Sequence, residues 1–336
     1  MPSKPRIGLL SPFFKPISAY EQPAWDLNLE LVVVTPSRID WKTHQVRGLV
    51  WNGQAWIDET VPFPQALYNR YYGSKPKVVS RLENIIGRNR VFNHITRFDK
   101  WVLHQILAKS DLKKLLPSTD VFTAKGLINY MERFGQVIVK PDAGQLGTRI
   151  YLVVKDGDFH LHYGTKSPIA SFSSKEDLLS RLEPMVNKGF LLQRYIPLAS
   201  VDGRAFDLRF LVQKNRKGVW QVSGMLSRLA LRYSYITNVS QAIVRVEETL
   251  TKAFPQKHLV PQLQELSIKG AQIAEESLGS LGELSVDFGL DQDGRIWIIE
   301  LNAKPMKSIF QALDDTQLMQ EIYRQPLCYA LHLATT

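Results

Sequence analysis

Three polar residues stand in two strand-like apolar runs near the C-terminal end of the sequence. The runs, residues 284–290 and 295–305, are separated by Asp-Gln-Asp-Gly, a turn sequence that predicts a hairpin. Asp287 lies in the first run, and Glu300 and Asn302 lie two residues apart in the second. Side chains two residues apart in a strand point to the same side. The hairpin therefore presents a carboxylate and an amide together, with a second carboxylate on the neighbouring strand.

These side chains carry the oxygen ligands that Mg²⁺ prefers in proteins. A carboxylate buried in a sheet is unfavourable unless a cation or a metal ion compensates its charge. Magnesium takes one or two carboxylates and completes its octahedron with water and substrate phosphates. We therefore predict a magnesium site formed by Asp287, Glu300 and Asn302. An acidic strand edge with solvated side chains is the alternative.

A lysine and a glycine-containing loop earlier in the chain suit phosphate binding. Residues 136–141 read as a strand with Lys140 near its end, and the loop that follows, residues 142–148, carries Gly144 and Gly147. Because another strand comes directly afterwards, the loop can fold over a nucleotide, with backbone N–H groups and an ammonium as donors. The pattern is not a Walker A loop, since neither a helix nor Gly-Lys-Ser/Thr follows. An ordinary hairpin is the alternative.

Two further strands bring polar groups that suit ligand binding. Residues 190–196 form an apolar strand that stops at Pro197, and the backbone groups of such a junction can meet the edge of an adenine. Residues 205–213 alternate in polarity, which places Asp207 and Arg209 on one face. A surface ion pair would explain this second pattern equally well.

Capping residues, glycines and apolar stripes predict the elements that position these strands. The predicted helices are one that begins at Lys100 after the cap Asp99, then residues 124–133 between Thr123 and Gly135, residues 175–187 between Ser174 and Gly189, and residues 262–278. A last segment, residues 326–333, is predicted to be a helix with Pro326 in its first turn. Strands at 6–10 and 29–34 and a hairpin around Asn52-Gly53 predict a small α/β unit at the N-terminus.

Composition indicates a globular protein with a preference for anionic ligands. The chain has 336 residues, 44% of them hydrophobic, which is enough for two or three subdomains. Lys and Arg exceed Asp and Glu by 42 to 32, but the basic residues are dispersed, so nucleic acid is the less favoured partner. The single Cys328 excludes a disulfide framework and a cysteine zinc site. Only a short apolar stretch precedes Pro12, which predicts neither a signal peptide nor a membrane span; we expect a cytoplasmic protein.

The order of these features resembles that of the ATP-grasp superfamily over residues 97–310. It runs from the lysine-bearing helix through Val-Ile-Val-Lys-Pro, the glycine loop, the apolar hinge and Asp-Leu-Arg to Asp and Glu-x-Asn. The N-terminal part, with Pro62-Phe63-Pro64 and Tyr68-Asn69-Arg70, is similar to the YheC/YheD group of endospore coat-associated ATP-grasp proteins. The resemblance therefore covers nearly the whole chain.

The resemblance implies an α/β (α+β) architecture in which two α+β subdomains clasp ATP. A small N-terminal α/β domain would occupy residues 1–96, and the ATP-grasp domain residues 97–336. Within the ATP-grasp domain, the resemblance implies a mobile lid subdomain at about 120–195 and a metal-binding subdomain at about 196–336, with the nucleotide between the two.

The resemblance also implies roles for individual residues. Residues 193–196 would be the adenine hinge, and Asp207 would contact the ribose or the lid. The full set implied for ATP binding is Lys100, Lys140, Gly144, Gly147, Gln193, Arg194, Tyr195, Ile196 and Asp207. The resemblance implies that Arg209, Arg228 and Lys140 are the cations that contact phosphate or a carboxylate substrate during catalysis. For magnesium, with two ions, it implies Asp287, Glu300 and Asn302. Lys304-Pro305-Met306 departs from many ligases, which carry a glycine after the proline, so the acceptor pocket is expected to differ there.

The activity implied is that of an ATP- and magnesium-dependent carboxylate–amine ligase that forms an amide or peptide bond through an acyl phosphate. Such a reaction depends on positioning and charge neutralisation and needs no nucleophilic Ser or Cys. The partners would be ATP, a carboxylate and an amine, with an association with the spore coat or cell envelope. The alternatives are a kinase of the same fold that phosphorylates a small molecule, and a non-catalytic nucleotide-binding spore-coat protein.

Overall fold

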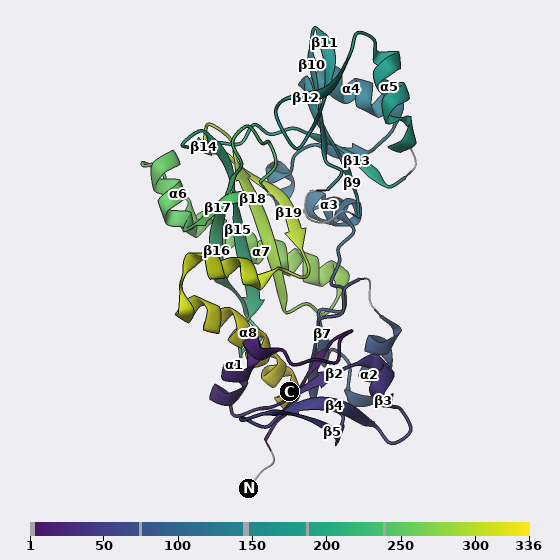
Figure 1. Ribbon diagram of the computed structural model, residues 1–336, viewed down its shortest axis with the longest axis vertical. Coiled ribbons are helices and arrows are strands. Elements are labelled where there is room, and N and C mark those ends of the chain that lie inside the picture. The colour runs from purple at the N-terminus through teal and green to yellow at the C-terminus, as the bar shows by residue number, and fades with distance from the viewer. Residues whose placement is uncertain (1–3, 74–75, 144–147, 186–187, 238–239) are drawn as a thin grey trace.

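Three β-sheets follow one another along the long axis of the computed structural model (Figure 1). The structure describes residues 4–73, 76–143, 148–185, 188–237 and 240–336. The N-terminal sheet lies at one end, the sheet of residues 119–194 at the other, and the third sheet, with Asp287, Glu300 and Asn302, between them. No helix among the described residues is long and apolar enough to cross a lipid bilayer.

The N-terminal sheet has a parallel centre and an antiparallel edge. Its strands, in the order β3-β4-β2-β1-β6-β7 with β5 on β4, are β1 (Arg6–Leu10), β2 (Glu30–Val34), β3 (Ile39–Asp40), β4 (Gln45–Trp51), β5 (Trp56–Pro62), β6 (Ala66–Asn69) and β7 (Val91–Phe92). Its helices are α1 (Glu21–Asp26) and α2 (Lys77–Ile86). The predicted hairpin β4–β5 is confirmed, because Asn52 accepts the amides of Gln54 and Ala55 and Gly53 adopts φ +101°.

The second sheet is antiparallel throughout and packs against two helices. Its strands, in the order β12-β11-β10-β9-β13-β8, are β8 (Thr119–Val121), β9 (Gln136–Pro141), β10 (Tyr151–Asp156), β11 (Asp158–Tyr163), β12 (Pro168–Phe172) and β13 (Phe190–Arg194). Its helices are α4 (Ala124–Phe134) and α5 (Lys175–Leu182). The start and end predicted for α4 are confirmed, since Thr123 caps it and Gly135 is left-handed. Helix α5 is shorter than predicted, because the chain tightens into a 3₁₀ turn, Glu183–Met185, that contains Pro184.

The third sheet carries the predicted chemistry. Its strands, in the order β17-β16-β15-β18-β19 with β14 on β15, are β14 (Ser200–Val201), β15 (Arg204–Lys214), β16 (Trp220–Ala230), β17 (Ser240–Val244), β18 (Glu283–Leu290) and β19 (Ile296–Asn302). Its helices are α3 (Lys100–Ala108), α6 (Val246–Ala253) and α7 (Val260–Leu278). Phe206, Leu208 and Phe210 of β15 lie in the core that also contains Leu263 of α7. The alternation predicted for β15 is thus confirmed, and its polar residues point to the opposite face.

Helix α8 (Thr316–Thr335) begins ten residues earlier than predicted, so placing Pro326 in its first turn was wrong. Asp315 caps the helix through the amide of Leu318. Proline inside a helix leaves the carbonyl four residues before it without its usual donor. Here that carbonyl, of Ile322, accepts a hydrogen bond from Nε2 of Gln213 at 2.8 Å. A side chain of β15 therefore replaces the missing helical hydrogen bond.

The same helix joins the N-terminal sheet to the third sheet. Ile322 packs with Leu211 of β15 and Phe310 of the 3₁₀ segment η5 (Lys307–Leu313). One turn further on, Leu327 and the residues after it pack with Ile7 of β1 in the N-terminal core. The C-terminal end of the chain therefore completes the N-terminal core, as Figure 1 shows.

We expect Gln213→Met to lower the free energy of unfolding by about 1–3 kcal/mol, because it leaves the buried carbonyl of Ile322 without a donor and removes one donor from the buried carboxylate of Glu283. Urea denaturation of the purified protein measures the change. The matched control is Gln256→Met at an exposed position, for which a change within about 0.5 kcal/mol is expected. Equal stability of the two variants would show that the carbonyl of Ile322 does not depend on Gln213.

Candidate active site

Four charged side chains on the third sheet form a buried network. In the register of the strands, Asp207 of β15 lies opposite Arg228 of β16, and Arg209 of β15 lies opposite Asp287 of β18. Nε and Nη2 of Arg209 donate to Oδ1 and Oδ2 of Asp287 at 2.8 and 2.7 Å. Nε of Arg228 donates to Oδ1 of Asp207 at 2.8 Å, and its Nη2 donates to Oδ2 of Asp287 at 3.0 Å. Two cations and two anions thus compensate one another.

The surroundings of Asp287 and Arg228 favour their charged forms. Burial acts to raise the pKa of Asp287, but the positive charges of Arg209 and Arg228 outweigh it and lower that pKa to about 2. Burial likewise opposes the charge of Arg228, whereas Asp207 and Asp287 raise its pKa. Thr237 adds a hydrogen bond to Oδ2 of Asp207 at 2.6 Å. The two guanidinium groups are therefore held in fixed orientations before any ligand binds.

The structure brings the three predicted magnesium ligands together. Asp287 lies directly opposite Glu300, and Asn302 is two residues further along β19 on the same face. Nδ2 of Asn302 is 3.3 Å from Oδ2 of Asp287. Glu300 forms an ion pair with Lys100 of α3 at 3.1 Å. Two carboxylates and an amide, all on neighbouring strands, make a donor set that suits Mg²⁺.

The three donors differ in their access to a ligand. Glu300 and Asn302 are partly exposed and line a cavity, whereas Asp287 is only 1% exposed and already bonded to two arginines. Among the described residues, no group of three His, Cys, Asp or Glu side chains could hold a metal ion. Asn302 and the oxygens of a bound phosphate would therefore have to complete the coordination of a magnesium ion here.

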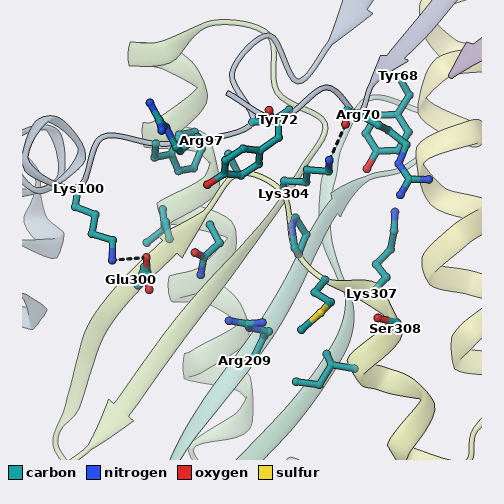
Figure 2. Close-up of a pocket in the computed structure, with 18 of the residues that line it drawn as sticks. Tyr68, Arg70, Tyr72, Arg97, Lys100, Arg209, Glu300, Lys304, Lys307 and Ser308 are labelled. Carbon is teal, nitrogen blue, oxygen red and sulfur yellow. Dashed lines mark hydrogen bonds and ion pairs between the residues drawn. The ribbon is translucent and has the colours of Figure 1, made fainter. Parts of the chain in front are cut away.

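The cavity has a volume of about 500 Å³ and strongly basic walls. Its charged lining residues are Arg70, Arg97, Lys100, Arg209, Arg228, Glu300, Lys304 and Lys307. Figure 2 shows the Lys100–Glu300 ion pair on one side of the cavity, Arg70, Lys304 and Lys307 on the other, and Arg209 below, between the two sides. An excess of cations around one cavity favours a ligand with several negative charges.

A smaller cavity, about 40 Å³, lies between the second and third sheets. Its apolar lining comes from α3, β13 and β19, in particular Leu103, Leu107, Leu191, Ile298 and Leu301. Its polar lining includes Thr119, Lys140, Gln193 and the Lys100–Glu300 pair that also borders the large cavity. The lining of this narrow slot, apolar with a few polar groups, suits a flat heteroaromatic base, and the slot would have to widen to admit one.

Lys140 lies buried at the polar side of this slot. Its Nζ donates to Oε1 of Gln193 at 2.9 Å, and Nε2 of Gln193 donates to Oγ1 of Thr119 at 2.9 Å. Burial, together with the positive charge of Lys100, lowers the pKa of Lys140 to about 8. Among the described residues, Lys140 has no carboxylate within ion-pair distance, so its ammonium is available to a phosphate.

The other residues expected to bind ATP are less directly placed. Arg194 is exposed, and its amide donates to the carbonyl of Ser118 at 2.8 Å. The amide of Tyr195 donates to the carbonyl of Gln136, and Ile196 is buried. Of residues 193–196 only Gln193 lines the slot, so their joint role as an adenine hinge stays a prediction. Gly144 and Gly147 lie outside the described residues.

Sequence reasoning missed the wall of the cavity that faces the N-terminal sheet. Arg70 follows β6, and Lys304 and Lys307 follow β19, more than 230 residues later. Nζ of Lys304 donates to the carbonyl of Arg70 at 2.6 Å. The available signals were the motif Tyr68-Asn69-Arg70, which was used only as a family marker, and the unusual Lys304-Pro305-Met306.

Comparison with known proteins agrees with this arrangement of sheets. A model of the YheC/D-like ATP-grasp family matches residues 88–333, and the chain belongs to that family. The endospore coat-associated protein YheD of Bacillus subtilis is 27% identical over 81% of this chain, which spans only 64% of the length of YheD. The endospore coat-associated protein YheC of the same organism is 24% identical over 90% of this chain and 87% of its own length.

A solved structure confirms the fold. The ATP-grasp ligase PsnB, in complex with a minimal precursor, Mg and ADP, matches with a TM-score of 0.58 over 98% of both chains at 15% identity. The α/β (α+β) ATP-grasp fold expected from the sequence is therefore confirmed. At this identity the likeness concerns the fold alone.

The low pKa of Lys140 predicts a pH-dependent affinity for ATP. If Lys140 binds a phosphate of ATP, we expect the affinity to fall as the pH rises from 7 to 9.5, because the ammonium loses its proton; a bound phosphate would move the midpoint above 8. Lys140→Met should weaken ATP binding roughly tenfold at pH 7 and remove this dependence. Calorimetric titration at several pH values measures both effects. The control, Lys155→Met at an exposed position of β10, should behave like the wild type, and a pH dependence that persists without Lys140 would assign it to another group.

Proposed function

We propose that this protein is an ATP- and magnesium-dependent ligase that joins a carboxylate to an amine through an acyl phosphate. The observation that carries the proposal is the meeting of two chemically different cavities at the Lys100–Glu300 ion pair. The narrow slot suits the adenine base, and the basic cavity suits the phosphates and the acceptor. The chain's membership of the YheC/D-like ATP-grasp family supports the assignment.

The proposed roles of the cations follow from where they lie. Lys140 and Lys100 border the slot and would bind the phosphates of ATP, with the ammonium of Lys140 held by Gln193. Arg209 and Arg228 line the basic cavity and would stabilise the charge on the transferred phosphoryl group and the attacking carboxylate. Because Asp207 and Asp287 already orient both guanidinium groups, no reorganisation is needed when charge develops.

Glu300 and Asn302 would hold magnesium at the wall of the cavity, with Asp287 as a third donor. Bound magnesium would neutralise the charge of the phosphates and so favour attack on the γ-phosphoryl group. Both oxygens of Asp287 accept hydrogen bonds from arginines, but Oδ1 accepts only one, so a lone pair of Oδ1 would be the donor that Asp287 offers to the metal. Oxygen donors of this type select Mg²⁺ over softer metals.

Calorimetric titration of ATP with and without magnesium tests the nucleotide site. A screen for phosphate release over pairs of carboxylates and amines then tests the reaction in the same protein preparation. A ligase releases phosphate only when both acceptors are present, whereas a kinase leaves the phosphoryl group on its substrate. Failure to bind ATP would reject the proposal, and a phosphorylated product would replace it with a kinase.

We also propose that the protein associates with the endospore coat. The support is the description of YheD and YheC as endospore coat-associated proteins. Immunodetection in the coat fraction of purified spores, compared with the soluble fraction of the same sporulating cells, tests this location. Recovery in the soluble fraction alone would contradict it.

A further inference from the structure

The charges around the basic cavity are not balanced at its N-terminal side. Seven cations line the cavity, and four of them form ion pairs among the described residues: Lys100 with Glu300, Arg209 with Asp287, Arg228 with Asp207 and Asp287, and Lys307 with Glu283. Arg70, Arg97 and Lys304 have no carboxylate partner among the described residues. Arg97 is exposed, so solvent can screen its charge, but Arg70 and Lys304 are partly buried.

Arg70 and Lys304 are held at one place by the fold. The main-chain carbonyl of Arg70 accepts from Nζ of Lys304, which brings the end of β6 against the segment after β19. The guanidinium of Arg70 lies 5.2 Å from the ring centroid of Tyr20, and its Nη1 is buried without a hydrogen-bond partner. Figure 2 shows the side chain of Arg70 pointing toward that of Lys307. Cations gathered in this way repel one another until an anion lies between them.

Lys307, on the same side of the cavity, has the counter-ion that Arg70 and Lys304 lack. Its Nζ forms an ion pair with Glu283 at 2.7 Å. Among the described residues, no carboxylate lies within ion-pair distance of Lys304 or Arg70.

We propose that Arg70 and Lys304 form a subsite for a second anionic group of the carboxylate acceptor, so that the acceptor carries at least two acidic groups. This inference rests on the proposed ligase function. The carboxylate that reacts would lie near Arg209, and the second anionic group, a carboxylate or a phosphate, would bind at the N-terminal side of the same cavity. A guanidinium and an ammonium together recognise either group through charge-assisted hydrogen bonds. An acidic peptide is an acceptor of this class.

The test compares an acidic with a neutral peptide by calorimetry at constant ionic strength, with and without ADP and magnesium. The probes are acetyl-Glu-Glu-Glu amide and acetyl-Gln-Gln-Gln amide. The wild type is expected to bind the acidic peptide at least about tenfold more tightly, since ion pairs in a partly buried site outweigh neutral hydrogen bonds. Arg70→Met with Lys304→Met should remove this difference. Two results overturn the proposal: equal binding of both peptides by the wild type, and a difference between the peptides that survives in the double variant. The exception is a subsite that binds inorganic phosphate, which the titration described below detects.

Two controls separate charge from folding. Arg216→Met with Lys217→Met removes the same charge from an exposed turn and should keep the difference between the peptides. Lys304→Gln retains a donor for the carbonyl of Arg70 but not the charge, and should lose several-fold in affinity for the acidic peptide. Wild-type affinity in a folded Lys304→Gln variant would overturn the role of Lys304.

A further titration distinguishes the two kinds of anion and separates this inference from the proposed function. If inorganic phosphate binds the wild type but not the double variant, the subsite is assigned to a phosphate group. If inorganic phosphate does not bind the wild type but the acidic peptide does, the subsite is assigned to a carboxylate. If neither probe binds, the subsite does not exist. Failure of ATP to bind would reject the ligase function, while the peptide titration without nucleotide would still report on Arg70 and Lys304.

Discussion

Asp287→Asn is expected to lower the free energy of unfolding by about 3–5 kcal/mol, because it leaves the buried guanidinium of Arg209 without its carboxylate partner and leaves Arg228 with Asp207 alone. The neutral amide preserves the size of the side chain but cannot compensate a guanidinium group. Urea denaturation at pH 7 measures the loss. The variant should also lose ATP turnover, since Arg209 would no longer be held in a fixed orientation.

The pH dependence of stability provides an independent check on Asp287. Its pKa is about 2 in the folded protein and about 3.9 in an unfolded chain, so its charge stabilises the fold above pH 4, and this contribution is lost as the pH falls toward 2. Asp287→Asn should remove that part of the acid sensitivity. The control is Asp293→Asn, an exposed acid in the turn of the same hairpin, which should stay within about 0.5 kcal/mol of the wild type. Similar losses in both variants would contradict a special role for the buried network.

Glu300→Gln is expected to have the opposite profile, a large loss of activity with little loss of stability. Glu300 is partly exposed, and the ion pair that it forms with Lys100 contributes little in contact with water. As a proposed ligand of magnesium, however, its charge matters directly to the reaction. Because removal of even an indirect partner of a metal commonly costs about 10–100-fold, the rate of ATP-dependent phosphate release should fall at least about 100-fold.

The measurement is phosphate release at saturating ATP over a range of magnesium concentrations. Magnesium in excess should restore part of the activity of Glu300→Gln, because a weakened metal site can be filled by mass action. Glu247→Gln, which changes an exposed acid of α6, is the matched control and should retain full activity. A Glu300→Gln enzyme with the magnesium response of the wild type would remove Glu300 from the metal site.

Comparison of Asp287 with Glu300 shows why the sequence could not separate their roles. Both are acids in apolar strands: strand periodicity placed Glu300 and Asn302 on one side, and the predicted hairpin placed Asp287 on the neighbouring strand. The burial of Asp287 under Arg209 and Arg228 depends on strand β15, whose register with β18 no local pattern specifies. The sequence therefore predicted an acidic site, while the tertiary structure made one acid an anchor for arginines and left the other facing the cavity.

Short-range rules were sufficient wherever neighbouring residues control the backbone. Asp99 and Thr123 cap their helices as predicted, and the turn at Asn52-Gly53 joins its two strands. The reason is that caps and tight turns satisfy backbone groups within a few residues. Pro326 is the counterexample: local rules place it at the start of a helix, but Gln213 from a distant strand supports it in the middle of one.

The parts of the candidate site that join distant segments were decided by tertiary packing alone. Arg70 meets Lys304 because β6 and the segment after β19 are brought together when α8 packs on both the N-terminal and third sheets. Lys140 meets Gln193 because β9 and β13 pair side by side, 53 residues apart in the chain. Residue types and strand periodicity identified Lys140, Asp207, Arg209, Asp287 and Glu300, and the resemblance to ATP-grasp proteins added Lys100 and Arg228. Which anion faces which cation follows from strand register and long-range burial, which depend on the whole fold.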